Sequence, residues 1–162
     1  MNAILEAMEK RRSVRKYKPD MVPQDAISSV ISAGLYAASG MNRQDTIIIA
    51  VTNKEVRDRL SAANAEIMGT KSDPFYGAPV VLVVLASKAS PTKVYDGSLT
   101  LGNMMLAAST LGLGSCWIHR AREEFERPEW KATGKASDTS YSATRTEKCP
   151  ERMKESPAAF SS

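Results

Sequence analysis

The sequence predicts a single domain that mixes helices and strands. Its 162 residues fall within the usual size of one domain. Several segments carry apolar residues at helical spacing, whereas two short runs are apolar throughout, as buried strands are. Val, Ile and Leu number 28 in residues 1–118 and none in residues 119–162. The core must therefore come from the first of these two stretches. Taken alone, the alternation of helix and strand favours parallel βαβ units.

The chain begins with two predicted helices. Residues 2–12 place Ile4, Leu5 and Met8 on one helical stripe. A second helix begins near Pro23, because proline suits the first helical position. Its apolar stripe consists of Ala26, Ile27, Val30, Ile31 and Leu35.

A strand and a capped helix follow. Residues 46–52, TIIIAVT, predict the strand. Asn53 has a side chain that can accept a hydrogen bond at the start of a helix over residues 54–68. The side chains expected to face inward are those of Val56, Leu60, Ala63 and Ile67.

The rest of the predicted domain begins with a loop rich in glycine and proline over residues 69–79. The run VVLVVLA at 80–86 is apolar on both faces and predicts a central strand. The later elements are a helix over roughly 95–111, a short strand at 115–118 and a last helix at 121–127 that Pro128 ends.

Composition excludes several classes of protein and of site. No apolar run reaches 18 residues, so no transmembrane helix is expected, and the N-terminus lacks the order of a secretory signal. Cys116 and Cys149 cannot form a disulfide framework, which favours a reducing, cytoplasmic location. No metal-ligand spacing, G-x-S-x-G or Walker A motif is present. The lone histidine, His119, is more often structural than catalytic. Chemistry carried by a cofactor fits this shortage of acids, bases and nucleophiles.

A basic cluster follows the first helix and contains Arg11, Arg12, Arg15, Lys16 and Lys18. Two guanidinium groups with a serine hydroxyl between them can surround one phosphate group. The same cations could instead stabilise a solvated helix end. A nucleic-acid surface is a third interpretation, although it requires more stacking aromatics than this segment has.

Two further segments could bind a planar ligand. AASGMNRQ, residues 37–44, carries two side-chain amides that could recognise the polar edge of a heterocycle. LGLGSCWI, residues 111–118, has glycines that allow close approach to its backbone. Each segment read alone is better explained by local structure, the first as a turn and the second as a helix end that leads into a strand.

Taken together, these segments resemble the FMN-dependent nitroreductase family. The resemblance rests on RRSVRKY, AASGMNRQ, DPFYGAPVVLVV and DGSLTLGNMMLAASTLGLGSCWI in this order, and it covers about residues 4–127. It implies an α+β fold with a mainly antiparallel sheet flanked by helices, which replaces the parallel arrangement suggested above. It also implies a homodimer that binds two FMN molecules at the subunit interface.

The resemblance further implies an oxidoreductase with a ping-pong mechanism. NAD(P)H, the co-substrate, gives a hydride to flavin N5 and leaves, and a nitroaromatic or quinone-like acceptor then enters the same pocket. No side chain has to act as a catalytic acid or base, and no metal, nucleic acid or membrane is involved. Two alternatives remain open, namely a family member that binds flavin weakly and is inactive, and a basic module that binds polyanions.

The implied cofactor-binding residues fall into groups along the chain. The phosphate and ribityl chain of FMN would be held by Arg11, Arg12, Ser13 and Arg15. The residues that would approach the flavin from the partner subunit are Ser39, Gly40, Asn42 and Gln44. Those that would lie at the flavin ring are Gly114 and Ser115, through their backbone, and Asn64.

The C-terminus departs from the family pattern. Family members usually end with a glycine-rich apolar strand and a basic pair, which residues 131–162 lack. Ser and Thr make up 10 of these 32 residues, a composition typical of disorder. We therefore expect an FMN-binding domain at 1–130 and a polar tail at 131–162. The tail is either a solvated extension or a replacement of the original C-terminus, for example by a shifted reading frame.

Overall fold

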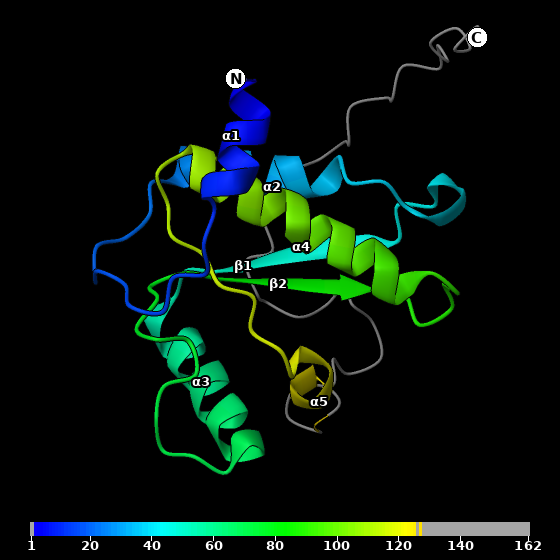
Figure 1. Cartoon of the computed structure of the whole chain (residues 1–162). Helices are drawn as coiled ribbons and strands as arrows, with labels where there is room; N and C mark the ends of the chain where they lie inside the picture. Colours follow the sequence, from blue (N-terminus) through cyan, green and yellow to red (C-terminus); the bar gives the residue numbers. More distant parts are fainter. Residues whose placement is uncertain (1, 126, 128–162) are drawn as a thin grey trace, which may run out of the picture.

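The computed structural model describes residues 2–125 and 127 of the chain. Figure 1 shows its elements, whose bounds follow in chain order. They are α1 (Ala3–Lys10), α2 (Gln24–Leu35), the 3₁₀ turn η1 (Gly40–Asn42), β1 (Thr46–Val51), α3 (Lys54–Met68), β2 (Val81–Ala86), α4 (Lys93–Thr110) and α5 (Ala121–Phe125).

The two strands form an antiparallel pair in which Thr46 lies opposite Ala86 and Val51 opposite Val81. α3 and the loop after it return the chain to the end of the sheet where β1 finishes, so β2 runs back beside β1. The parallel arrangement favoured by the alternation of elements is therefore wrong. The antiparallel α+β fold implied by the resemblance is confirmed.

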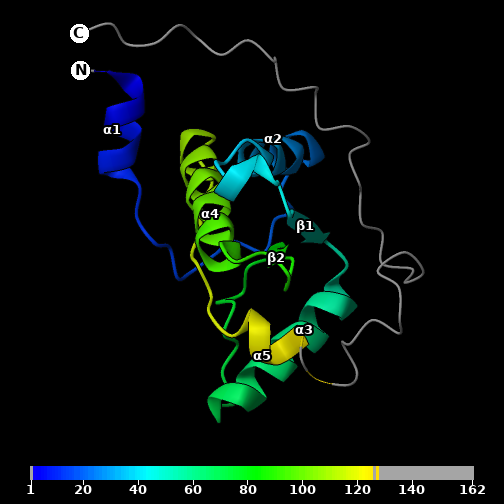
Figure 2. The same cartoon turned by 90° about the vertical axis from the view of Figure 1, so that its right-hand side faces the viewer.

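The sheet is covered on both faces, which gives three layers (Figures 1 and 2). One face packs against α3 and α5, with Val51, Leu60, Phe75 and Val83 at the centre of that cluster. The other face packs against α2 and α4, and its core residues are Val30, Met104 and Ala108. Burial from both sides explains why the sequences of the two strands are apolar at nearly every position.

Local signals in the sequence set the helix boundaries. The side chain of Asn53 accepts a hydrogen bond of 3.1 Å from the backbone N–H of Val56, and α3 begins at the next residue, as predicted. Gly69 ends the helix with a φ of 66°, a left-handed conformation that glycine adopts without strain. α2 begins directly after Pro23.

Three predicted features differ from the structure or lie outside it. α1 stands apart from the layers, with Ile4, Leu5 and Met8 each more than half exposed (Figure 2). Within the described residues, the strand predicted at 115–118 is reduced to one bridge, which pairs Ser115 with Ser13 in the irregular segment after α1. The tail at 131–162 lies outside the described residues, so its proposed origin stays a prediction.

Candidate functional site

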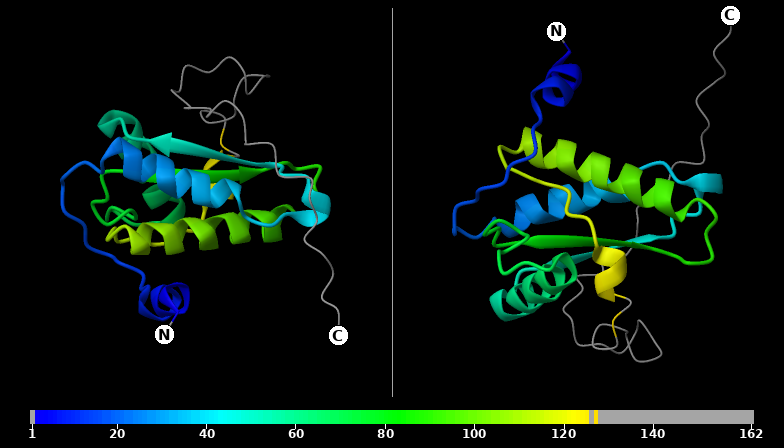
Figure 3. Two further views of the ribbon diagram at one scale, coloured as in Figure 1. Left: turned by 90° about the horizontal axis from the view of Figure 1, so that it is seen from above. Right: turned by 60° about the horizontal axis from the view of Figure 1, so that its bottom comes forward.

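The basic segment after α1 meets the glycine-containing loop after α4 (Figures 1 and 3). Ser13 forms a parallel bridge with Ser115, and the N–H of Val14 donates to the carbonyl of Ser115 at 3.0 Å. A Cβ at Gly114 would lie 2.9 Å from a methyl carbon of Val14, so only glycine fits there. Two predicted binding groups that are far apart in the sequence are thus brought together: the group at residues 11–15 and the pair Gly114 and Ser115.

Arg11, two residues before this bridge in the sequence, carries a cationic nitrogen without a hydrogen-bond partner. Its Nη1 atom is buried and has no hydrogen-bond partner. A buried donor without a partner costs on the order of 1–3 kcal/mol, and more when it is charged. The side chain of Ser13 is exposed two residues later. An anion at this position would satisfy the guanidinium.

The other two predicted cations differ from Arg11. The Arg12 guanidinium donates to the carbonyls of Glu9 and of Arg11 itself, so it stabilises the C-terminal end of α1. Arg15 is exposed to solvent.

Tyr17 holds the basic segment in shape, a role that the sequence did not reveal. Its hydroxyl donates to the carbonyl of Val14 at 2.7 Å. Burial, followed by the nearby Cys116 thiol, raises the pKa of Tyr17 to about 12. The hydroxyl therefore remains a donor at every pH at which the protein would be studied.

The loop of residues 39–44 packs at the start of α4. The N–H of Gly40 donates to Asp96 Oδ1 at 2.9 Å, and the N–H of Gln44 donates to the Ser39 hydroxyl at 3.0 Å. Met41, Asn42 and Gln44 all have a φ of 54°. A left-handed conformation costs roughly 1–2 kcal/mol per non-glycine residue, so the surrounding contacts must stabilise this loop.

Asp96 is a residue that the sequence analysis missed, and it is only 3% exposed. The Gly40 N–H first, and then the Thr92 hydroxyl, lower the pKa of its carboxyl group, so Asp96 is ionised at neutral pH. Its position at the head of the DGSLTLGNMM motif was the only signal available, since an acidic first turn is common in helices.

α4 separates the two halves of the predicted site within one chain. The 39–44 loop lies at its N-terminal end, and the loop of residues 111–115 leaves its C-terminal end (Figure 1). α4 has 18 residues, which makes it about 27 Å long. One small ligand cannot contact both loops of a single chain.

Asn64 is placed at the junction of α3 and α5 and is 1% exposed. Its Nδ2 donates to Glu124 Oε2 at 3.0 Å, and its Oδ1 accepts from Arg120 Nε at 3.0 Å. Burial raises the pKa of Glu124, whose Oε1 is buried without a partner. A ligand could reach the Asn64 amide only if α5 moved away.

A model of the nitroreductase family matches residues 8–127, which is most of the chain. The chain belongs to the nitroreductase family. The match ends where the predicted resemblance ended and begins four residues later than expected.

Solved structures and curated proteins agree with this family membership. A nitroreductase with bound FMN from Bacteroides fragilis has a TM-score of 0.72 and 30% identity, over 81% of this chain and 77% of that one. A nitroreductase with bound FMN from Desulfitobacterium hafniense has a TM-score of 0.70 and 27% identity, over 77% and 74%. The NADPH-flavin oxidoreductase of Vibrio harveyi is 30% identical over 129 residues. These residues are 73% of this chain and 54% of that protein, so the chain spans about half of this curated relative.

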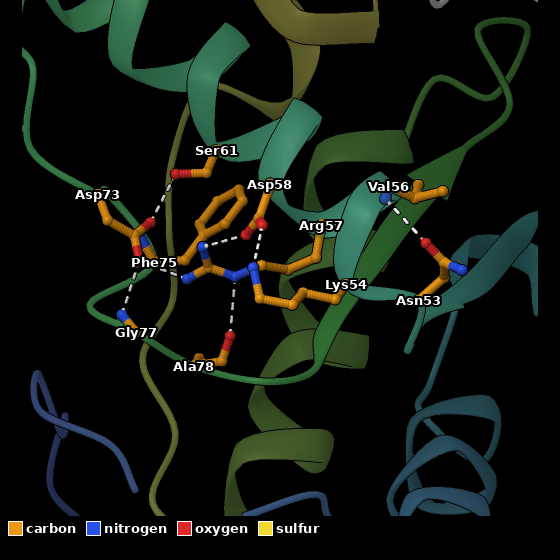
Figure 4. A network of polar contacts seen from close by, with 10 residues as sticks. All are labelled: Asn53, Lys54, Val56, Arg57, Asp58, Ser61, Asp73, Phe75, Gly77 and Ala78. Atoms are coloured by element: carbon orange, nitrogen blue, oxygen red, sulfur yellow. Dashed lines mark hydrogen bonds and ion pairs between the residues drawn. The ribbon is translucent and has the colours of Figure 1, made fainter. Parts of the chain in front are cut away.

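The DPFYGAP segment of this family member has a structural role (Figure 4). Asp73 accepts hydrogen bonds from Arg57, from the Ser61 hydroxyl at 2.6 Å and from the N–H groups of Phe75 at 2.9 Å and Gly77 at 2.7 Å. Burial alone would raise the pKa of Asp73, but these donors outweigh it and lower the pKa to about 2. The network fixes the loop that leads into β2.

The described part of the chain contains neither a candidate metal site nor a candidate membrane-spanning helix. Among residues 2–125 and 127, no group of three or more His, Cys, Asp and Glu side chains is arranged to hold a metal ion. Within the same residues, no helix combines the length and apolar character needed to cross a membrane.

Proposed function

We propose that the chain is an FMN-dependent oxidoreductase that uses NAD(P)H to reduce nitroaromatic or quinone-like acceptors. The observation that carries the proposal is the buried, unpartnered Nη1 of Arg11, two residues before the bridge that joins Ser13 to Ser115. The nitroreductases of Bacteroides fragilis and Desulfitobacterium hafniense contain bound FMN, which supports the same cofactor here. A cytoplasmic location stays a prediction from cysteine usage.

The residues at the junction suit the phosphate of FMN. Arg11 would pair with the phosphate, Ser13 and Arg15 would add a hydroxyl and a second cation, and residues 114 and 115 would let the flavin approach their backbone. FMN supplies the redox chemistry when bound, because it can accept a hydride from NAD(P)H and pass two electrons to an acceptor. The protein's contribution is binding and orientation, without a side-chain acid or base.

We further propose that the active form is a homodimer. The 39–44 loop lies at the N-terminal end of α4, whereas the chain reaches the proposed phosphate site after leaving the C-terminal end of this 18-residue helix, which is about 27 Å long. In a dimer this loop can meet the flavin held by the partner subunit. Light scattering combined with activity measurements across a dilution series tests this, and a fully active, flavin-loaded monomer would contradict it.

Titration of the flavin-free protein with FMN tests the cofactor site. Arg11→Ala should weaken binding about 10- to 150-fold, the effect of losing one charge-assisted hydrogen bond. Lys18→Ala is the matched control, because it removes a positive charge from the same segment at an exposed residue outside the predicted site. Equal affinities of wild type and Arg11→Ala would remove Arg11 from the site.

The absorbance spectrum of the purified protein separates the alternatives. Flavin bands support the oxidoreductase. A colourless dimer with weak FMN affinity supports an inactive family member. Salt-sensitive binding of DNA without flavin supports a polyanion-binding module.

A further inference from the structure

Asp96 joins the 39–44 loop to α4 across 56 positions of sequence. Its Oδ1 accepts the Gly40 N–H at 2.9 Å, and its Oδ2 accepts the Thr92 hydroxyl at 2.7 Å. The contact is close, since a Cβ at Gly40 would lie 2.3 Å from the Thr92 hydroxyl oxygen. The loop backbone therefore rests directly on the first turn of α4, against a carboxylate that is 3% exposed.

The loop also has a conformation that short peptides avoid. Three of its residues, Met41, Asn42 and Gln44, have a φ of 54°. Its internal hydrogen bonds are local and include those from the Asn42 N–H to the Ser39 carbonyl at 3.0 Å, from the Arg43 N–H to the Gly40 carbonyl at 3.2 Å and from the Gln44 N–H to the Ser39 hydroxyl at 3.0 Å. Local bonds of this kind exist in many turn conformations, whereas the bond to Asp96 fixes the loop against a rigid helix.

We propose that Asp96 is a positioning residue, which holds the 39–44 loop in the one conformation that presents Asn42 and Gln44 to the flavin of the partner subunit. This inference rests on the proposed function. Asp96 itself touches no ligand and acts through the backbone of Gly40. If the loop holds its binding conformation for only a fraction of the time, the apparent affinity for FMN falls by the same fraction.

Two substitutions of Asp96 separate hydrogen bonding from simple loss of a side chain. Asp96→Ala removes the acceptor, whereas Asp96→Asn keeps an amide oxygen that can accept the Gly40 N–H. Gly40→Ala disturbs the same contact without changing Asp96, because the methyl group added to the loop would collide with Thr92. Asp25→Ala is the matched control, since Asp25 is the exposed acidic residue in the first turn of α2.

Amide hydrogen exchange of the full flavin-free chain provides the first measurement, and FMN titration provides the second. In Asp96→Ala the amides of residues 40–44 should exchange about tenfold faster or more, the effect of losing a bond to a charged acceptor. FMN should bind weaker by a similar factor in Asp96→Ala and in Gly40→Ala. Asp96→Asn should restore most of the protection and affinity, and Asp25→Ala should match the wild type.

The two measurements fail in distinguishable ways. A folded Asp96→Ala protein with wild-type exchange at residues 40–44 would overturn the positioning role. Faster exchange throughout α3 as well as the loop, without rescue by Asp96→Asn, would overturn it too, because Asp96 would then be a general stabilising residue. A wild-type chain that binds no FMN overturns the proposed function, and the exchange rates of the flavin-free protein still decide whether Asp96 holds the loop.

Discussion

Replacing Asp73 with asparagine should destabilise the protein by an amount that its contacts define. The new amide would keep one oxygen, which can still accept from the Ser61 hydroxyl and the Phe75 N–H. Its nitrogen would replace the oxygen that accepts from Arg57 and from the Gly77 N–H, so donors would face donors. The Arg57 side chain is only 10% exposed, so water cannot easily take over that role.

The magnitude follows from one lost charge-assisted hydrogen bond and one backbone donor left unpaired. Those losses are worth about 1.5–3 and about 1 kcal/mol, and partial exposure of Asp73 reduces the sum to about 2–3 kcal/mol. A domain of this size loses about 2–4 °C of melting temperature per kcal/mol. Thermal unfolding at pH 7 should therefore show a midpoint about 5–10 °C below that of the wild type.

The stability difference between wild type and Asp73→Asn should become smaller at acidic pH. The pKa of Asp73 is lowered to about 2 in the folded state, so the unfolded state binds the proton more readily. The ionised carboxylate therefore stabilises the fold above the unfolded pKa of about 3.9, and this contribution is lost as pH falls toward about 2. Because Asp73 is partly solvated, the pH-dependent part should be about 1 kcal/mol. The difference in melting temperature between wild type and Asp73→Asn should therefore decrease only below about pH 4.

Asp58→Asn is the control for this experiment. Asp58 contacts the same guanidinium at 3.2 Å but lies on the exposed side of α3. Its substitution should change the midpoint little. Two results would refute the proposal that the Asp73 network fixes the loop. One is a melting temperature of Asp73→Asn no lower than that of Asp58→Asn, and the other is a difference from the wild type that stays constant below about pH 4.

Three other substitutions test separate parts of the structure. Asn53→Ala should cost about 1 kcal/mol, measured by thermal unfolding, because α3 loses its N-terminal cap. Glu124→Gln should raise the melting temperature at neutral pH. The pKa of Glu124 is raised in the folded state, so the wild type loses stability as the pH rises through that pKa, and the variant should show no such loss. Gly114→Ala should weaken FMN binding by displacing Val14, whereas Gly102→Ala, with nothing within 4 Å of its new methyl group, should leave binding unchanged.

Local features of this fold could be predicted from the sequence because their causes are local. Asn53 and Gly69 mark the ends of α3 through bonds and backbone angles within a few residues. The direction of the strands has no local cause, since a helix and a loop can return the chain to either end of a sheet. It was available only through the family resemblance.

The candidate site shows the same division. Helical periodicity places Asn64 on the buried face with Leu60. Its hydrogen-bond partner Glu124 is 60 positions away, so no local sequence pattern could predict this pair. Asp96 was overlooked for the same reason, because its acceptor role depends on a backbone N–H 56 positions earlier. Spacing predicted Arg11 and Arg12 together, and only the structure shows that the Arg12 guanidinium is bonded to α1 whereas Arg11 Nη1 has no partner.

The length of α4 predicts the arrangement of sites in the proposed dimer. In each chain the 39–44 loop lies at the N-terminal end of this helix and the proposed phosphate site follows its C-terminal end, and the 18 residues of the helix make it about 27 Å long. A two-fold axis that brings the loop of one chain to the junction of its partner must do the reverse at the other end. The dimer should then contain two identical sites, so FMN should saturate at one molecule per chain. Saturation at one FMN per dimer, measured by absorbance and light scattering, would contradict an arrangement in which each site takes one end from each subunit.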